Sequence, residues 1–171
     1  VEAALAEAPA KVLAFVHAET STGACSDAAA LCALARRHGA LSVVDCVTSL
    51  GGIPVDVAAW DADVVYSGTQ KCLSAPPGLS PIAISRRAQD AIRGRKEKVR
   101  NWLLDFNLIM AYWGGPDGSG GGRTYHHTAP INALYGLHES LVVLFEEGVQ
   151  AATARHARLH EALVAGFEAA G

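Results

Sequence analysis

The sequence predicts an α/β protein built on a mainly parallel sheet, with one antiparallel strand and with helices on both faces. Three observations lead to this fold class. Short apolar runs alternate with segments of helical periodicity. Polar residues follow each of the first three runs, as they do where parallel strands end at a ligand site. The connection before the fourth run is too short to hold a crossover helix, so that strand should run antiparallel.

The first half of the chain supplies the parallel strands. Residues 11–16 are a short apolar run that breaks into a turn-prone stretch, which predicts a buried strand. Asp27 caps the helix that follows, and Gly39 ends it. Residues 41–44 and 64–66 are the second and third strands. The order strand, helix, strand implies parallel pairing with right-handed crossovers.

The second half is mostly helical. Residues 79–85 form the fourth strand, and residues 86–100 a charged helix. A further helix is expected between Trp102 and Trp113, two residues that we assign to the core or to an interface. The pattern over residues 131–170 is helical.

Glycines mark two possible interruptions of a helix and one loop in this second half. Gly136 and Gly148 are candidate interruptions of the last helical segment. Residues 114–122 are glycine-rich, but no strand precedes them and no helix follows. We therefore interpret them as a surface loop rather than a phosphate-binding motif.

Composition limits the class of protein. The net charge is -3, so no positive excess exists for binding nucleic acid. No run reaches the ~18 apolar residues of a membrane span, and no basic, apolar leader opens the chain. The spacings of the four cysteines match neither a zinc site nor a redox pair, which indicates reduced thiols inside the cell. Because Val1 opens a helix-like stretch, we expect an internal piece of a longer protein.

Polar side chains gather where the predicted parallel strands end. These are residues 20–22, Asp45, and the pair Gln70 and Lys71. Ligands in open α/β sheets bind at this edge. Alone, Asp45 is as well explained as a cap, and Lys71 is better explained as an exposed loop lysine. Together, a carboxylate and an amine directly after buried strands favour a binding site.

Four motifs resemble those of a known family. They are HAETSTG at residues 17–23, VDCVTSLGG at 44–52, YSGTQKCLSAPPG at 66–78 and YHHTAP at 125–130. On these motifs the chain resembles the class V, fold-type I, pyridoxal-phosphate aminotransferases, and within them the alanine-glyoxylate and serine-pyruvate aminotransferases. The resemblance covers practically the whole chain, and YSGTQK followed by APPG is its most specific part.

The resemblance implies a role for each matching residue. Lys71 matches the lysine that forms the internal Schiff base with pyridoxal 5'-phosphate and then moves the proton between two carbons. Asp45 matches the aspartate that pairs with the pyridinium nitrogen, where its charge keeps the ring an electron sink. Thr20 matches a hydroxyl residue near the ring, Val47 a side chain that packs flat under it, and Gln70 a residue near the phosphate.

The resemblance also implies a homodimer. Tyr125 and Thr128 match residues that reach the cofactor phosphate of the neighbouring subunit. No ligand cluster accompanies His126 and His127, so we expect structural hydrogen bonds there and no metal site. Residues 1–145 match part of the cofactor-binding large domain, and residues 146–171 a helix leading to a small domain. Because that domain's substrate arginine and a ring-stacking aromatic residue lie outside the chain, we expect residues 1–171 alone to be inactive.

The expected reaction moves an amino group from alanine or serine to glyoxylate or pyruvate. Its compartment is the peroxisome, the mitochondrion or the cytoplasm. Other reactions of the same superfamily remain open: serine-glyoxylate transamination, cysteine desulfuration and kynurenine cleavage. Desulfuration ranks low because Cys72 adjoins Lys71 and is expected to point away from the site. A non-catalytic nucleotide-binding module is the remaining alternative, although GxGxxG after a strand is missing.

Overall fold

The computed structural model describes residues 1–114 and 124–171. Contacts divide the chain into two compact units. The sheet unit comprises Val1–Ile84 with Ile131–Gly171, and the connecting unit comprises Ser85–Pro130. The sheet unit contains α1 (Glu2–Glu7), β1 (Val12–Val16), α2 (Ala28–Arg37), β2 (Leu41–Asp45), β3 (Val64–Tyr66), β4 (Ile82–Ile84), α5 (Ile131–Glu147) and α6 (Val149–Ala170). No helix in these ranges is long and apolar enough to cross a membrane.

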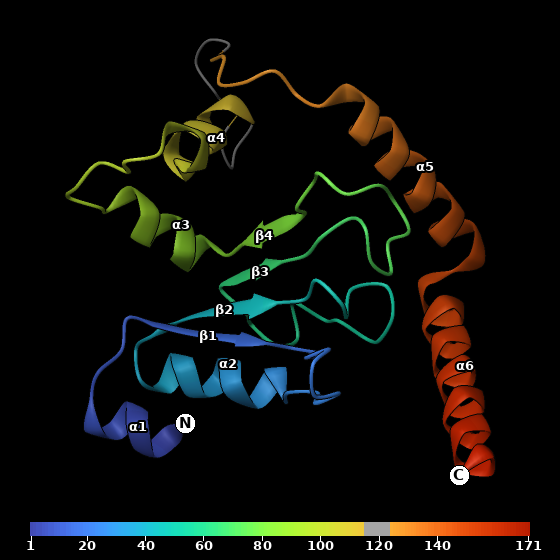
Figure 1. Ribbon diagram of the computed structural model, residues 1–171. Helices are drawn as coiled ribbons and strands as arrows, with labels where there is room; N and C mark the ends of the chain where they lie inside the picture. Colours follow the sequence, from blue (N-terminus) through green and yellow to red (C-terminus); the bar gives the residue numbers. More distant parts are fainter. Residues whose placement is uncertain (115–123) are drawn as a thin grey trace. The chain divides into compact units, whose positions relative to one another are not determined.

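The four strands form one sheet in the order β1-β2-β3-β4 (Figure 1). β1 pairs with β2, and β2 with β3, in parallel. β4 runs antiparallel to β3. The mainly parallel sheet with one antiparallel strand is therefore confirmed. The register places Val16, Asp45 and Tyr66 side by side, so the three parallel strands end at the same level.

The core lies between the sheet and α2, which runs along one face of β1 and β2 (Figure 1). Its buried members are Cys32, Val44, Cys46, Ala62 and Val65. The side chain of Asp27 accepts a hydrogen bond from the Ala30 amide at 2.9 Å, which confirms the predicted cap. On the opposite face Val12 is 49% exposed, so helices on both faces stay a prediction there.

At the amino edge of the sheet, reciprocal hydrogen bonds between Ser42 and Asp63 connect β2 with the residue before β3. Asp63 Oδ2 accepts a hydrogen bond from the Ser42 amide at 2.9 Å, and Ser42 Oγ accepts one from the Asp63 amide at 2.9 Å. Both residues are 1% exposed. A reciprocal buried pair of this kind fixes the register, because a slip of one strand would leave both groups unpaired.

The predicted interruption at Gly148 is confirmed, and the one at Gly136 is wrong. Gly148 has φ +89° and separates α5 from α6. α5 continues through Gly136 without a break. A Cβ at that position would lie 3.2 Å from the ring of Pro76. The glycine therefore allows the loop after β3 to pack closely against α5.

In the connecting unit the predicted helices are shorter. α3 covers Arg86–Arg93 and ends at Gly94, not at residue 100. Residues 102–113 contain a 3-10 turn, η1 (Trp102–Leu104), and a separate helix, α4 (Phe106–Tyr112), instead of one helix. Asp105 divides them, because its side chain accepts a hydrogen bond from the Asn107 amide and begins α4.

Two other predictions fall in this unit. Trp102 and Trp113 are 56% and 60% exposed, so neither belongs to the core of this chain. The predicted glycine-rich loop at residues 114–122 lies outside the described residues, apart from Gly114.

Candidate active site

Three loops leave the carboxyl edge of the parallel strands and are tied to one another. Thr48 Oγ1, in the loop after β2, donates to the Ala18 carbonyl after β1 at 2.6 Å. Ser67 Oγ, after β3, donates to the Cys46 carbonyl at 3.0 Å. These bonds connect the loops and strand ends that carry five of the predicted site residues, which are Thr20, Asp45, Val47, Gln70 and Lys71.

Asp45 is the last residue of β2, and both of its carboxylate oxygens accept a hydrogen bond. The Val47 amide donates to Oδ1 at 2.8 Å. The phenol of Tyr66, the neighbour of Asp45 in the register, donates to Oδ2 at 2.6 Å. A carboxylate offers about four acceptor positions. Two of them therefore stay available to a ligand.

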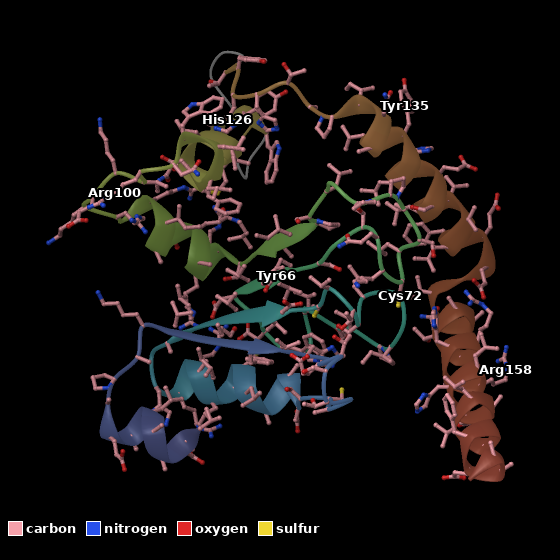
Figure 2. The ribbon with its side chains drawn as sticks, in the orientation of Figure 1. Tyr66, Cys72, Arg100, His126, Tyr135 and Arg158 are labelled. Carbon is pink, nitrogen blue, oxygen red and sulfur yellow. The ribbon has the colours of Figure 1, made fainter. Side chains whose placement is uncertain are left out.

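Tyr66, labelled in Figure 2, is the partner of Asp45 in the pairing of β2 with β3. Its hydrogen bond to Asp45, together with partial burial, raises the pKa of Tyr66 to about 12. The phenol therefore stays protonated at neutral pH and acts as a donor. With Asp45 it supplies the polar groups of a hollow of about 190 Å³, whose other lining residues are Ala14, Phe15, Val16 and Val43.

The loop that carries Lys71 is held from within, while Lys71 itself is exposed. Thr69 is fully buried, and its hydroxyl donates to the Pro76 carbonyl at 2.6 Å. The Ser74 amide donates to the Lys71 carbonyl at 2.9 Å. Within the described residues the ammonium of Lys71 makes no hydrogen bond or ion pair. The backbone is thus fixed and the amine is available for chemistry.

Gln70 lies beside Lys71, and its side-chain amide folds over Gly68. A Cβ on Gly68 would lie 2.8 Å from the amide oxygen of Gln70. The glycine therefore leaves room for this amide close to the loop backbone. Gln70 is exposed at the carboxyl edge, where its NH₂ group can donate to an anion.

Cys72 contacts the loop after β2 through its thiol, and its expected direction away from the site stays a prediction. Its thiol donates to the Thr48 carbonyl at 3.6 Å. Gly51 and Gly52 line this position, and a Cβ on Gly52 would lie only 2.7 Å from the sulfur. Desolvation raises the pKa of the Cys72 thiol, which keeps it neutral. The residue after Lys71 is therefore an anchor of the loop.

Thr20 lies at the tip of the loop after β1. The amide and the hydroxyl of Ser21 both donate to Glu19 Oε1, at 2.8 and 2.7 Å, which lowers the pKa of Glu19. The Gly23 amide donates to the Glu19 carbonyl at 2.8 Å. Glu19 therefore shapes the turn, and Thr20 is exposed on it.

The remaining predicted residues, Tyr125 and Thr128, belong to the connecting unit. Their hydroxyl oxygens lie 2.8 Å apart on the exposed surface. Between them, His126 is 2% exposed and stacks on Trp102 with ring centroids 4.2 Å apart. His126 Nε2 lies 3.0 Å from the Trp102 carbonyl oxygen, and its Nδ1 lies 2.7 Å from Nδ1 of His127. The histidines are thus engaged in structural hydrogen bonds.

Sequence reasoning missed two residues of this edge, Tyr66 and Thr48. Each bonds to a residue more than 20 positions away, so no local pattern shows the contact. A signal existed for Tyr66: like Asp45, it directly ends a predicted parallel strand. Aligning the ends of the two strands would have placed the side chains next to each other.

Comparison with known proteins identifies the family. The sequence model of the family "Aminotransferase class-V" matches residues 1–171, the whole chain. The chain belongs to the class V aminotransferases. Members of this family depend on pyridoxal phosphate, as the resemblance predicted.

Individual class V aminotransferases align with most of the chain. The alanine-glyoxylate aminotransferase of Oryctolagus cuniculus is 39% identical over 91% of this chain and 39% of its own length. The (S)-ureidoglycine-glyoxylate transaminase of Bacillus subtilis is 34% identical over 94% of this chain and 42% of its own length. The crystal structure of an alanine-glyoxylate aminotransferase from Nostoc sp. matches with a TM-score of 0.92 at 44% identity, covering 99% of this chain and 44% of that one. The chain spans about 40% of the length of these relatives.

The residues of the sheet unit fit the cofactor of this family. A pyridine ring nitrogen needs a carboxylate with spare acceptor capacity, which Asp45 has. An aldehyde needs an amine that no other group engages, and within the described residues Lys71 provides one. A phosphate needs donors, and the Gln70 amide is exposed at the same edge.

Proposed function

We propose that this chain is part of a pyridoxal-phosphate-dependent transaminase that moves the amino group of alanine or serine to glyoxylate or pyruvate. The observation that carries the proposal is the joining of three loops at one edge of the sheet. These loops carry Lys71, whose neighbour Cys72 is anchored, Asp45, whose carboxylate is oriented, and Thr20. Family membership supports the cofactor, and the names of the matched relatives support the reaction.

Each residue of the edge has a proposed role in holding the cofactor. Lys71 Nζ forms the covalent link to it. The Asp45 carboxylate holds a proton on the ring nitrogen, and the Val47 side chain packs against the ring. The Thr20 hydroxyl lies near the ring, and the Gln70 amide donates to the phosphate.

The chemistry is divided between cofactor and protein. When bound, pyridoxal phosphate supplies a carbonyl carbon that accepts the amino group. Its ring withdraws the electron pair left on the α-carbon of the amino donor. Once displaced from its link by the substrate amine, Lys71 Nζ would take the proton from the α-carbon of the amino donor and deliver it to the cofactor carbon that carried the carbonyl. The anchoring of Cys72 supports this role, because it fixes the backbone next to Lys71 while leaving the amine free to move between two positions.

The relatives favour transamination over the alternatives. The three reported above are named for glyoxylate and differ in the amino donor, which is alanine in two names and (S)-ureidoglycine in the third. Glyoxylate is therefore the better supported acceptor. Neither desulfuration nor kynurenine cleavage is favoured. Cys72 is half-buried and its thiol donates to the Thr48 carbonyl, which argues against its use as a sulfur carrier.

We also propose a homodimer in which Tyr125 and Thr128 donate to the cofactor phosphate of the neighbouring subunit. A dianionic phosphate needs several donors, and the strand-end loops offer Gln70 and a few hydroxyls. The convergence of two hydroxyls at 2.8 Å supports the idea, since one phosphate can accept from both. In this arrangement the histidine pair holds the backbone that carries them.

Reduction with borohydride tests the cofactor assignment. The complete protein, loaded with pyridoxal phosphate, should carry a pyridoxyl group on Lys71 after reduction, proteolysis and mass spectrometry. Lys11, Lys96 and Lys98 provide internal controls in the same chain. A label on one of these and not on Lys71 would reject the assignment.

A substrate panel tests the reaction. The loaded protein is assayed with alanine, serine and (S)-ureidoglycine as donors, each with glyoxylate and with pyruvate. We expect the fastest turnover with glyoxylate as acceptor. Loading without turnover of any pair would reject the transaminase proposal and keep the cofactor assignment.

A further inference from the structure

Tyr66 holds one oxygen of the residue proposed to face the cofactor ring. Its phenol donates to Asp45 Oδ2 at 2.6 Å, a short bond between a hydroxyl and a carboxylate. The Val47 amide donates to Oδ1 at 2.8 Å. A carboxylate turns about its Cβ–Cγ bond when only one oxygen is held, because that torsion is soft. With both oxygens held, the plane of the carboxylate is fixed.

The sheet makes this contact rigid. Asp45 and Tyr66 are direct partners in the parallel pairing of β2 and β3, so their side chains leave the same face. The Cys46 amide donates to the Tyr66 carbonyl at 2.8 Å and continues the pairing past both residues. The two strands therefore set the distance between phenol and carboxylate.

The surroundings favour a strong bond. The hollow of about 190 Å³ that both residues line is otherwise apolar. Asp45 and Tyr66 are both half-buried, so the bond is partly shielded from water, which strengthens it. The raised pKa of Tyr66, about 12, means that the phenol remains a donor at neutral pH and well above it.

We propose that Tyr66 is a positioning residue that orients the Asp45 carboxylate toward the ring nitrogen of the cofactor. The inference rests on the proposed function, because it takes Asp45 as the partner of that nitrogen. Tyr66 itself acts through Asp45. Its loss should loosen the carboxylate and weaken the hold on the ring proton, with a smaller effect than the loss of the Asp45 charge.

The test measures the ring nitrogen directly. The complete protein is loaded with ¹⁵N-labelled pyridoxal phosphate, and the nitrogen resonance is followed against pH in wild type, Tyr66→Phe, Asp45→Asn and Tyr135→Phe. Tyr66→Phe removes only the hydroxyl and keeps the ring that packs on the sheet. Tyr135→Phe is the matched control, since Tyr135 is 71% exposed on α5 (Figure 2). Cofactor affinity is measured on the same set.

We expect Tyr66→Phe to move the nitrogen resonance part of the way toward that of Asp45→Asn, and to weaken cofactor binding about tenfold, the scale of one hydrogen bond to a charged group. Tyr135→Phe should match wild type. If Asp45→Asn shifts the resonance and Tyr66→Phe leaves it at the wild-type position, the inference is wrong while the proposed function stands. If the wild-type protein binds no pyridoxal phosphate, both are wrong.

A second probe covers the case in which Tyr66→Phe does not fold. Fluorotyrosine placed at position 66 keeps the size of the side chain and makes the phenol a stronger donor. A stronger donor draws negative charge from the Asp45 carboxylate, so the nitrogen resonance should then shift toward that of Asp45→Asn. An unchanged resonance in a loaded, fluorinated protein would reject the positioning role.

Discussion

Gly52→Ala should destabilise the protein through a single contact. A Cβ at this buried position would lie 2.7 Å from Cys72 Sγ. Non-bonded carbon and sulfur atoms need at least about 3.5 Å, so the overlap approaches 1 Å. The sulfur cannot retreat freely, because its hydrogen bond to the Thr48 carbonyl holds it. Overpacking of this kind costs about 1–3 kcal/mol.

The cost can be measured and assigned with a second substitution. At about 2–4 °C per kcal/mol for a chain of this size, we expect the melting temperature to fall by about 2–12 °C. Cys72→Ala removes the sulfur, so the double variant should recover most of the loss. Gly166→Ala is the matched control, because among the described residues no atom outside the local backbone of α6 lies within 4 Å of its Cβ position. It should be neutral or stabilise by up to about 1 kcal/mol.

The same variant reports on the active site. Cys72 follows Lys71 directly, so a displaced Cys72 should also weaken cofactor loading, and Cys72→Ala should restore it. An unchanged melting temperature in Gly52→Ala would refute the argument from packing. A double variant no more stable than Gly52→Ala would show that the cost comes from elsewhere in the loop.

Three further outcomes are expected. Burial lowers the pKa of His17, so below the ordinary pKa of about 6.5 the unfolded chain binds a proton that the folded chain does not. Urea unfolding should show stability lost as pH falls from 7 to 5, and less so in His17→Phe; equal slopes would contradict this. Asp45→Asn should lower turnover on the order of a hundredfold with a much smaller change in melting temperature, and near wild-type turnover with bound cofactor would count against it. Finally, mixing Lys71→Ala with a Tyr125→Phe, Thr128→Val variant should restore activity if the hydroxyls act across the dimer, since a mixed dimer then has one site without either defect. No recovery after confirmed subunit exchange would place the hydroxyls in their own subunit.

The strands and the first helix could be predicted because their signals are local. β1 and β2 are apolar runs bounded by turn residues, and α2 has a capping aspartate at one end and a glycine with φ +71° at the other. The predicted charged helix, residues 86–100, is longer than α3. Arginine and lysine favour helices, and composition alone does not show that α3 ends at Gly94. At Gly136, a contact with Pro76 explains the glycine, and such contacts are invisible in a sequence.

The sequence predicts which residues belong to the candidate site. It does not predict the hydrogen bonds that hold the loops of this site together. The residue types at the ends of β1, β2 and β3 pointed to the edge, since ligands bind there in parallel sheets. The bonds that hold the edge together join different loops and depend on register. Thr48 to Ala18 and Tyr66 to Asp45 span 30 and 21 positions. Residue types thus predict where a ligand binds, while the supporting contacts require the fold.

Two aspartates of the same sheet show how a structural carboxylate differs from a functional one. Asp63, at the amino edge, is 1% exposed, and its Oδ2 accepts from both the amide and the hydroxyl of Ser42. Its hydrogen-bonding capacity is directed inward, so its removal should cost stability. Asp45, at the carboxyl edge, is half-buried, and its two bonds come from Val47 and Tyr66, which orient it without enclosing it. The sequence shows both as an acidic residue beside a buried strand. The two aspartates differ in how many acceptor positions of the carboxylate remain accessible. Asp45 keeps such positions at the carboxyl edge, so it is the better candidate to bind a ligand.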